Sequence, residues 1–205
     1  MFNLTDFPKR VGVMLLNGAV LLPGAMIPLY IFEPRYRRML SEALDSNRIF
    51  AIAQASDDSE LISMVGGAGL IRACVKNEDG TSHLILQGIC RVRLSNWDSN
   101  SEYPLAEAEV LTSSGSDSAS CHRLRAEILN QIERLVATTP SLPNELLDSL
   151  KMCENPAAFS DVAAACLVTE PSLKLLFLDE LNVLRRLEIL AAILSEIASP
   201  AQDQN

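Results

Sequence analysis

The sequence predicts an α+β protein in which a β-barrel carrying one helix is followed by a C-terminal bundle of α-helices. Up to residue 112, short apolar runs are separated by Gly, Pro and Asp-Gly turns, which is typical of strands in a sheet. After a Ser-rich stretch, apolar residues recur at helical spacing. Six or seven short strands with one helix favour a closed or nearly closed barrel. We therefore expect a barrel over residues 1–112, a flexible linker over 113–119 and a helical bundle over 120–205.

The strands of the barrel half are predicted by alternating apolar residues and by the turns between them. The dipeptide Asp79-Gly80 supplies the positive φ that a tight hairpin needs, and period-two alternation is clearest just before residue 112. The polar run 57–60 indicates a loop. The expected strands are 11–16, 27–32, 49–54, 70–76, 82–87, 91–94 and 105–111.

The passage from strand 27–32 into the following helix is the most specific local signal. Ile and Leu alternate with Tyr30 and Phe32, so both faces of this strand are apolar and it should be largely buried. Pro34 follows closely, and its fixed φ and missing N–H suit the first turn of a helix. Apolar residues at helical spacing extend that helix over residues 34–44.

The C-terminal part is predicted to contain four helices. Asn155-Pro156 combines a capping side chain with a proline suited to the first helical turn. Glu170-Pro171 should interrupt the helical pattern, and Asp179 should cap the last helix. The expected helices are one around 124–136, one opened by Pro143, one over 155–167 and one over 179–197.

The uncharged stretch from residue 11 to residue 32 raises the alternative of a membrane helix or signal anchor. Its length and the preceding Lys9-Arg10 would permit that reading. However, Pro23, Gly24 and Pro28 each break or weaken a helix. Two strands joined by a turn explain the same residues better, so we expect no membrane segment.

Composition and charge narrow the class of protein. Hydrophobic residues make up 48% of the chain and charged residues 21%, which is typical of a globular protein. A formal net charge of −9 argues against general binding to nucleic-acid backbones, because that requires a basic surface. The five cysteines form no CxxC pair and no zinc-ligand spacing, so we expect buried thiols in a reducing cytoplasm, with no metal and no cofactor.

Several short motifs, in order, resemble the N-terminal substrate-recognition domain of Lon proteases. The resemblance spans residues 8–198 and rests most on the block Phe32-Glu33-Pro34-Arg35-Tyr36. Leu22 stands where that family usually has Phe, and Gly67 stands where Thr is common. The other matching motifs are Leu22-Pro23-Gly24, Val65-Gly66, Asp79-Gly80-Thr81, Leu86-Gln87-Gly88 with Arg91 and Arg93, Asp161-Val162-Ala163-Ala164, Lys174, Leu178 and Arg186-Leu187.

The resemblance implies a PUA-like β-barrel followed by a helical bundle, and a role in binding unfolded or tagged polypeptides. From it we expect a stand-alone, non-catalytic adaptor in proteolysis or protein quality control, which serves a separate ATP-dependent protease or chaperone. Candidate peptide-binding residues are Tyr30, Phe32, Arg35, Tyr36 and Trp97. Tyr36 also shares a helical face with apolar residues, which favours a place in the core.

The sequence gives no sign of ATPase or protease chemistry. The only glycine cluster, Gly66-Gly67-Ala68-Gly69, is followed by Leu70 and therefore lacks the lysine and hydroxyl of a phosphate-binding loop. His83 follows the predicted hairpin turn and is expected to be an ordinary strand side chain, since no nucleophile accompanies it. We therefore expect no catalytic residues and no enzyme activity.

The PUA-like barrel that the resemblance implies leaves a different class of function open. PUA-like barrels also bind RNA, and a local basic patch could coexist with an acidic total charge. The arginines that would form the patch are Arg35, Arg37, Arg38 and Arg48. Binding of RNA should weaken steeply with salt, whereas binding of apolar peptides should not. A hydrolase with a concealed site is the third and weakest alternative.

Overall fold

The computed structural model describes residues 6–55, 64–140 and 142–198. The chain folds into two compact units. The first comprises residues 1–112 together with 170–179, and the second comprises residues 113–169 and 180–205. Residues 170–179 were expected in the helical half, but they pack with the strands instead.

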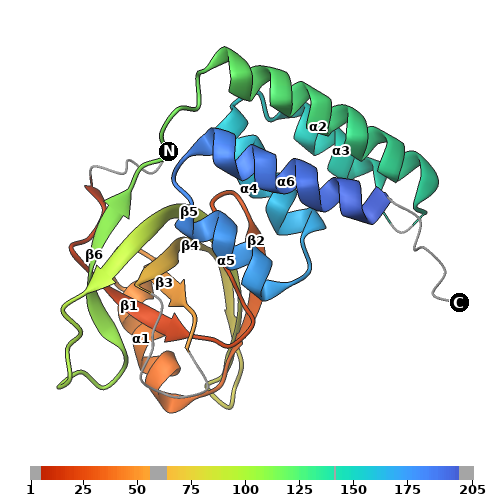
Figure 1. Ribbon diagram of the computed structural model, residues 1–205. Helices are drawn as coiled ribbons and strands as arrows, with labels where there is room; N and C mark the ends of the chain where they lie inside the picture. Colours follow the sequence, from red (N-terminus) through yellow and green to blue (C-terminus); the bar gives the residue numbers. More distant parts are fainter. Residues whose placement is uncertain (1–5, 56–63, 141, 199–205) are drawn as a thin grey trace, which may run out of the picture. The chain divides into compact units, whose positions relative to one another are not determined.

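Six strands and one helix form the body of the first unit (Figure 1). The sheet order is β2-β5-β4-β3-β1-β6, and a further pairing of β5 with β6 closes five of the strands into a barrel. Among the described residues, β2 pairs only with β5, so it lies outside the closed ring as an edge strand. The elements are β1 (Arg10–Leu15), β2 (Met26–Ile31), α1 (Pro34–Leu44), β3 (Ile49–Ala53), β4 (Val65–Lys76), β5 (Ser82–Ser95) and β6 (Leu105–Leu111).

Strand β5 is the longest and holds the barrel together. Its first half pairs with β2 and its second half with β6, while β4 pairs along most of its length. The sequence predicted two strands here, separated at Gly88, but the structure has one continuous strand. The predicted hairpin at Asp79-Gly80 is confirmed, since Gly80 has φ +81° and its N–H donates to the Asn77 carbonyl at 3.0 Å.

Two glycines let the segment before β2 cross closely over the sheet. A Cβ at Gly67 of β4 would lie 1.9 Å from the Leu21 carbonyl oxygen, and one at Gly88 of β5 would lie 2.2 Å from the Leu22 carbonyl oxygen. Leu21 and Leu22 are fully buried there. The glycine cluster therefore serves close packing of the backbone, which gives it a structural role.

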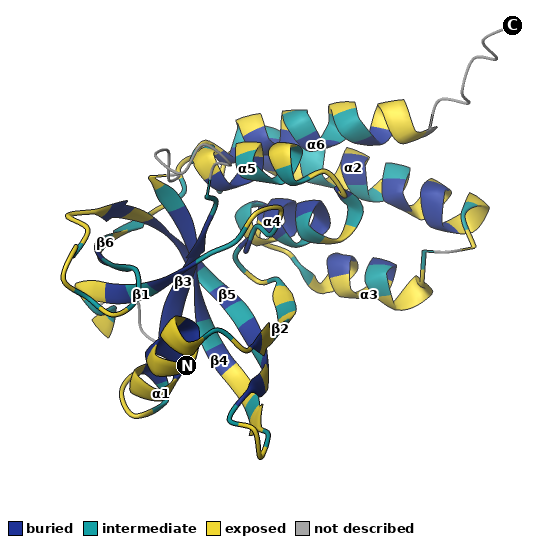
Figure 2. Cartoon of the chain, turned by 90° about the horizontal axis from the view of Figure 1, so that it is seen from below, coloured by how far each residue is buried: buried dark blue, intermediate teal, exposed yellow. Residues whose placement is uncertain are grey.

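Helix α1 covers the core of the barrel with one face. Its buried residues, Tyr36, Met39, Leu40 and Ala43, recur at helical spacing and pack with Phe50 of β3. Its opposite face is exposed, as Figure 2 shows. The helix begins at Pro34 as predicted, because Pro needs no hydrogen-bond acceptor in the first turn.

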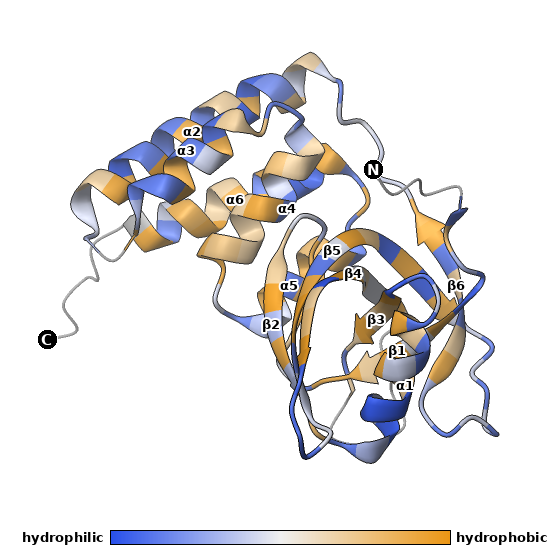
Figure 3. Ribbon diagram, turned by 180° about the vertical axis from the view of Figure 1, so that it is seen from behind, coloured by the Kyte–Doolittle hydropathy of each residue, from blue (hydrophilic) through white to orange (hydrophobic). Residues whose placement is uncertain are grey.

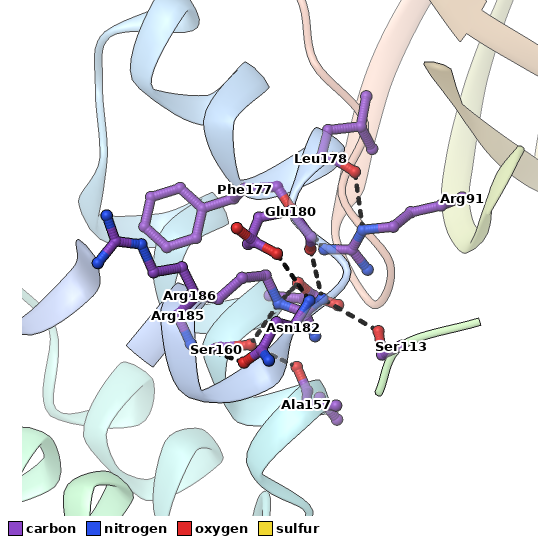
Figure 4. A network of polar contacts seen from close by, with 12 residues as sticks. Arg91, Ser113, Ala157, Ser160, Phe177, Leu178, Glu180, Asn182, Arg185 and Arg186 are labelled. Atoms are coloured by element: carbon purple, nitrogen blue, oxygen red, sulfur yellow. Dashed lines mark hydrogen bonds and ion pairs between the residues drawn. The ribbon is translucent and has the colours of Figure 1, made fainter. Parts of the chain in front are cut away.

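Helix α5 (Pro171–Asp179) belongs to the first unit although it comes late in the sequence. Arg91 of β5, only 3% exposed, donates from Nη2 to the Phe177 carbonyl at 2.7 Å and from Nε to the Leu178 carbonyl at 3.0 Å (Figure 4). These carbonyls lie in the last turn of α5, where no intrahelical donor remains for them. Arg91 therefore ties the end of α5 to the barrel wall.

Helix α5 is absent from the sequence-based prediction, in which Pro171 interrupts the helical pattern. The Lys174 N–H donates to the Glu170 carbonyl at 3.0 Å, so Pro171 occupies the first turn of a helix and does not end one. The prediction that Asp179 caps the last helix was wrong. Asp179 ends α5, and Asn182 caps the next helix by accepting from the Arg185 N–H at 3.1 Å.

The second unit is a bundle of four helices. The core lies where these helices pack, and it includes Ile128, Ile132, Phe159, Leu187 and Leu190. Asn155 caps its helix as predicted, accepting from the N–H groups of residues 157 and 158. The helices are α2 (Ala119–Thr138), α3 (Asn144–Met152), α4 (Pro156–Leu167) and α6 (Val183–Ala198).

A buried arginine connects three parts of this bundle. The side chain of Arg186 on α6 has no exposed surface. It donates to the Ser113 hydroxyl at 3.0 Å, to the Ser160 hydroxyl at 3.1 Å and to the Glu180 carbonyl at 2.8 Å, and it pairs with Asp161 at 3.4 Å (Figure 4). Because the buried guanidinium of Arg186 is paired and hydrogen-bonded, it holds α6, α4 and the segments at Ser113 and Glu180 in fixed positions relative to one another.

The expected linker at residues 113–119 is anchored in the second unit. The Ser114 N–H donates to the Leu181 carbonyl at 2.8 Å, and the Val183 N–H donates to the Ser114 carbonyl at 3.0 Å. Ser118 caps α2 through its side chain. The Ser-rich composition therefore reflects capping and bridging side chains, and the expectation of a flexible linker does not describe this segment.

Candidate peptide-binding face on the barrel

Three neighbouring strands present a continuous apolar surface on the outside of the barrel. In the register of β2, β5 and β4, Tyr30 lies opposite His83, which lies opposite Val75. In the next row, Pro28 lies opposite Ile85, which lies opposite Ala73. Side chains two residues apart on a strand share a face. We call these six residues, Pro28, Tyr30, Ala73, Val75, His83 and Ile85, the outer face.

A shallow groove of about 340 Å³ lies on this face. Besides the six residues of the outer face, it is lined by Leu29 and Leu84. Val75 is 64% exposed and Tyr30 is 46% exposed, which is high for large apolar side chains of a sheet. Figure 3 shows apolar residues along β2 and β4. A groove lined by exposed apolar side chains is a candidate place for a partner to bind.

Three rings stack beside the groove. The centroids of Tyr30 and His83 are 4.7 Å apart, and those of Tyr30 and Phe32 are 5.8 Å apart, with an interplanar angle of 27° in both pairs. Phe32 is 58% exposed. Stacked aromatic rings offer a large, rigid apolar surface with little side-chain entropy left to lose on binding.

The free edge of β2 borders the outer face. Pro28 has no N–H to give to a ladder, so its nitrogen faces away from β5, toward the open side. By alternation, the main-chain groups of Met26 and Tyr30 also face that side. Met26 is 65% exposed. The prediction of a largely buried β2 was therefore wrong: Met26, Pro28 and Tyr30 on its outer side are exposed, and only the residues on the other side pack toward the core.

The five residues expected to contact peptide do not lie together. Tyr30 and Phe32 lie together at the outer face. Tyr36 is only 1% exposed, and its hydroxyl accepts from the Leu15 N–H at 3.1 Å, so it is a core residue and not a surface contact. Its helical spacing already favoured that place. Arg35 pairs with Glu33 at 2.8 Å and stands over the Tyr36 ring.

Trp97 lies away from this surface. It follows Asn96, whose φ is +49°, in the turn after β5, at the end of that strand opposite to His83. Its side chain is partly exposed. Trp97 therefore does not belong to the groove, and one peptide residue could not contact both.

Val75, His83, Ile85 and Ala73 complete the groove but were not expected to contact peptide. His83 was correctly expected to be a strand side chain. The available signal was the alternation of apolar residues in the two strands that flank Asp79-Gly80, which marks a second apolar face in addition to the core face.

Tyr103 and Glu42 form a hydrogen-bonded pair in the first unit. The Tyr103 hydroxyl donates to Glu42 Oε2 at 2.6 Å; burial, and then this bond, raise the pKa of Tyr103 to about 12. The bond from Tyr103 and a further one from Arg38 lower the pKa of Glu42. Within residues 6–55, 64–140 and 142–198, no group of His, Cys, Asp and Glu side chains is placed to hold a metal ion.

The 11–32 stretch does not form a membrane helix. Strands β1 and β2 occupy much of it. In the part of the chain that the structure describes, no helix has the length and apolar character needed to cross a bilayer.

Comparison with known families supplies the context of this fold. The model of the ATP-dependent protease La (LON) substrate-binding domain matches residues 10–196. The chain belongs to this family. The resemblance read from the sequence motifs is thereby confirmed, and so is a relation to proteases through their substrate-binding domain.

Curated relatives and solved structures agree with this assignment. The Lon protease of Escherichia coli strain K12 is 31% identical over 195 residues, and that of Desulfosudis oleivorans is 27% identical over 188 residues. These matches cover 92% and 88% of this chain but only 25% and 23% of those proteins. The chain thus corresponds to about a quarter of the relatives it matches.

Two solved structures share the fold. The N-terminal domain of Mycobacterium avium complex Lon protease aligns with a TM-score of 0.77 and 18% identity, covering 92% of this chain and 99% of that one. A Lon N-terminal domain protein from Xanthomonas campestris gives 0.68 and 22%, covering 90% and 98%. The predicted α+β class, a barrel followed by helices, is confirmed.

Proposed function

We propose that this protein is a non-catalytic module that binds extended segments of unfolded polypeptides at the outer face and the open edge of β2. The observation that carries this proposal is the exposed apolar surface of Tyr30, Phe32 and Val75 beside an unpaired strand edge. A peptide added along β2 would gain main-chain hydrogen bonds, while alternate side chains would enter the groove. Membership of a substrate-binding domain family supports the same function.

The expected affinity is modest. Ordering a flexible chain costs entropy, and the groove is shallow, with a volume of about 340 Å³. Weak, sequence-tolerant binding suits a module that meets many unfolded clients. As an adaptor in the cytoplasm, it would hand these clients to a separate ATP-dependent protease or chaperone, and casein incubated with this protein and ATP alone would stay intact.

RNA binding is the weaker candidate, because much of the charge it needs is already engaged. Arg35 pairs with Glu33, and Arg38 pairs with Glu42 at 2.7 Å. Arg48 donates to the Ile71 carbonyl at 3.2 Å. The proposed basic patch is therefore largely neutralised or committed to the fold.

The decisive experiment measures binding of a labelled, permanently unfolded polypeptide, such as reduced and carboxymethylated α-lactalbumin, by fluorescence anisotropy. The Tyr30→Ala/Phe32→Ala variant should bind about thirty- to a thousandfold more weakly, because two exposed aromatic contacts are worth about 1–2 kcal/mol each. Met152→Ala is the matched control, since Met152 is a more exposed apolar residue on the second unit. Equal losses in both variants, or a steep fall of wild-type binding with salt, would contradict the proposal.

A further inference from the structure

A second cavity lies between α1 and the β4–β5 hairpin. Its volume is about 490 Å³, which is within the range of roughly 300–1,000 Å³ that ligand sites occupy. It is separate from the outer face, because its residues Cys74 and Ser82 alternate along their strands with Val75 and His83. The lining residues are Pro34, Arg37, Arg38, Leu40, Ser41, Leu44, Cys74, Lys76, Gly80 and Ser82.

The charge of this cavity is opposite to that of the protein. Three of its lining residues are basic and none is acidic, although the chain carries a net charge of −9. Arg38 is already paired with Glu42. Among the residues that the structure describes, Arg37 and Lys76 form no ion pair within 4 Å. Both cations line the cavity, and the charge of Arg37 also acts on the neighbouring Asp79, whose pKa it helps to lower.

The hairpin turn places one of these cations. A Cβ added at Gly80 would lie 1.9 Å from Nη2 of Arg37, so the guanidinium lies directly against the turn backbone. Only glycine permits this approach, and Gly80 also has φ +81°. The nearby Asp79 carboxylate is held by Thr81, whose hydroxyl and N–H donate to it at 2.7 and 2.9 Å. The hydrogen bonds of that carboxylate go to the turn itself, and its interaction with Arg37 is a weaker, purely coulombic one.

The remaining lining is apolar or weakly polar. Leu40 is nearly fully buried, and Leu44, Cys74 and Pro34 extend the apolar part. A ligand that suits this cavity combines an anionic group with an adjoining apolar body. In a polypeptide, the last residue has this combination, because its α-carboxylate and its side chain share one Cα atom. An Asp or Glu side chain carries the anion without the apolar group.

We propose that this cavity binds the C-terminal carboxylate of polypeptides that end in an apolar residue, with Arg37 and Lys76 holding the carboxylate. The inference rests on the proposed function, and it adds recognition of chain ends to binding of extended segments. Arg and Lys side chains bind carboxylates through charge-assisted hydrogen bonds, and capture of a C-terminal carboxylate is an established mode of peptide recognition.

The test compares two fluorescein-labelled peptides of one sequence ending in Leu, one with a free C-terminal carboxylate and one amidated. Wild-type protein should bind the acid about three- to tenfold more tightly than the amide, because the pair lies in a solvent-accessible cavity. Arg37→Gln/Lys76→Gln should bind both forms equally. The matched control is Arg93→Gln, which removes an exposed arginine outside the cavity and should keep the preference. Circular dichroism verifies that each variant is folded.

Equal binding of acid and amide by the wild type would overturn this inference, and so would loss of the preference in Arg93→Gln. The same peptides with Tyr30→Ala/Phe32→Ala separate it from the proposed function. If that variant no longer binds unfolded polypeptide, while the wild type binds the acid and the amide peptide with equal affinity, the outer face is the binding site and this inference alone fails. If the acid preference exists but that variant binds unfolded polypeptide normally, the proposed function fails.

Discussion

Replacing Arg91 with Met should release α5 from the barrel. Arg91 is buried, and it donates to the carbonyls of Phe177 and Leu178 at 2.7 and 3.0 Å. Net contributions of hydrogen bonds to charged groups are about 1.5–3 kcal/mol each, and a Met side chain recovers part of the lost packing. We therefore expect a loss of about 2–4 kcal/mol in the free energy that holds α5 in place.

Native-state hydrogen exchange measures this loss locally. Exchange of the α5 amides, residues 171–179, should become about a hundredfold faster, because about 3 kcal/mol changes an opening equilibrium by two orders of magnitude. Arg93→Met is the matched control on the same strand, since Arg93 is exposed and makes a surface ion pair with Glu109 at 3.1 Å. Its effect should stay below about 0.5–1 kcal/mol.

Exchange of α5 at the wild-type rate in Arg91→Met would refute the proposed role of Arg91. Acceleration of α5 exchange to the same extent by Arg93→Met would refute it as well. In either case, the buried apolar residues of α5 hold it in place without help from the arginine.

Two further predictions concern ionisable groups. The Thr81 hydroxyl, and then its N–H, hold the pKa of Asp79 below its ordinary value of 3.8, so the stability that this carboxylate adds is present above that pH and is lost as pH falls through the folded value. The difference in urea midpoint between wild type and Asp79→Asn should therefore shrink between pH 6 and pH 3, and a constant difference would contradict the assignment. Burial raises the pKa of the Cys90 thiol to about 12, so iodoacetamide at pH 8 should leave Cys90 unmodified in the folded protein, as followed by mass spectrometry; rapid alkylation there would contradict its burial.

Local signals in the sequence were sufficient for most of the barrel and for where its helix begins. Pro34 marked the start of α1, and Asp79-Gly80 marked the hairpin, because both depend on the conformational limits of one or two residues. The continuity of strand β5 across Gly88 could not be predicted from such local signals. It depends on the Leu22 backbone crossing above that glycine, a contact between segments far apart in the sequence.

The site was harder to predict than the fold, since exposure depends on which face of a strand packs against the core. Both faces of β2 are apolar and indicated burial, but only one of them packs inward, and Tyr30 and Phe32 remain exposed. The same limit explains why α5 was missed. Arg91 and Phe177 are 86 residues apart, and no local pattern shows that one binds the other.

The most direct test of the account is to map amide chemical-shift changes while an unfolded polypeptide is titrated into the labelled protein. We predict the largest changes along β2 and at residues 73–75 and 83–85, which flank the groove. Changes confined to helices α2, α3, α4 and α6, with β2 unaffected, would contradict the claim that the barrel surface holds the client.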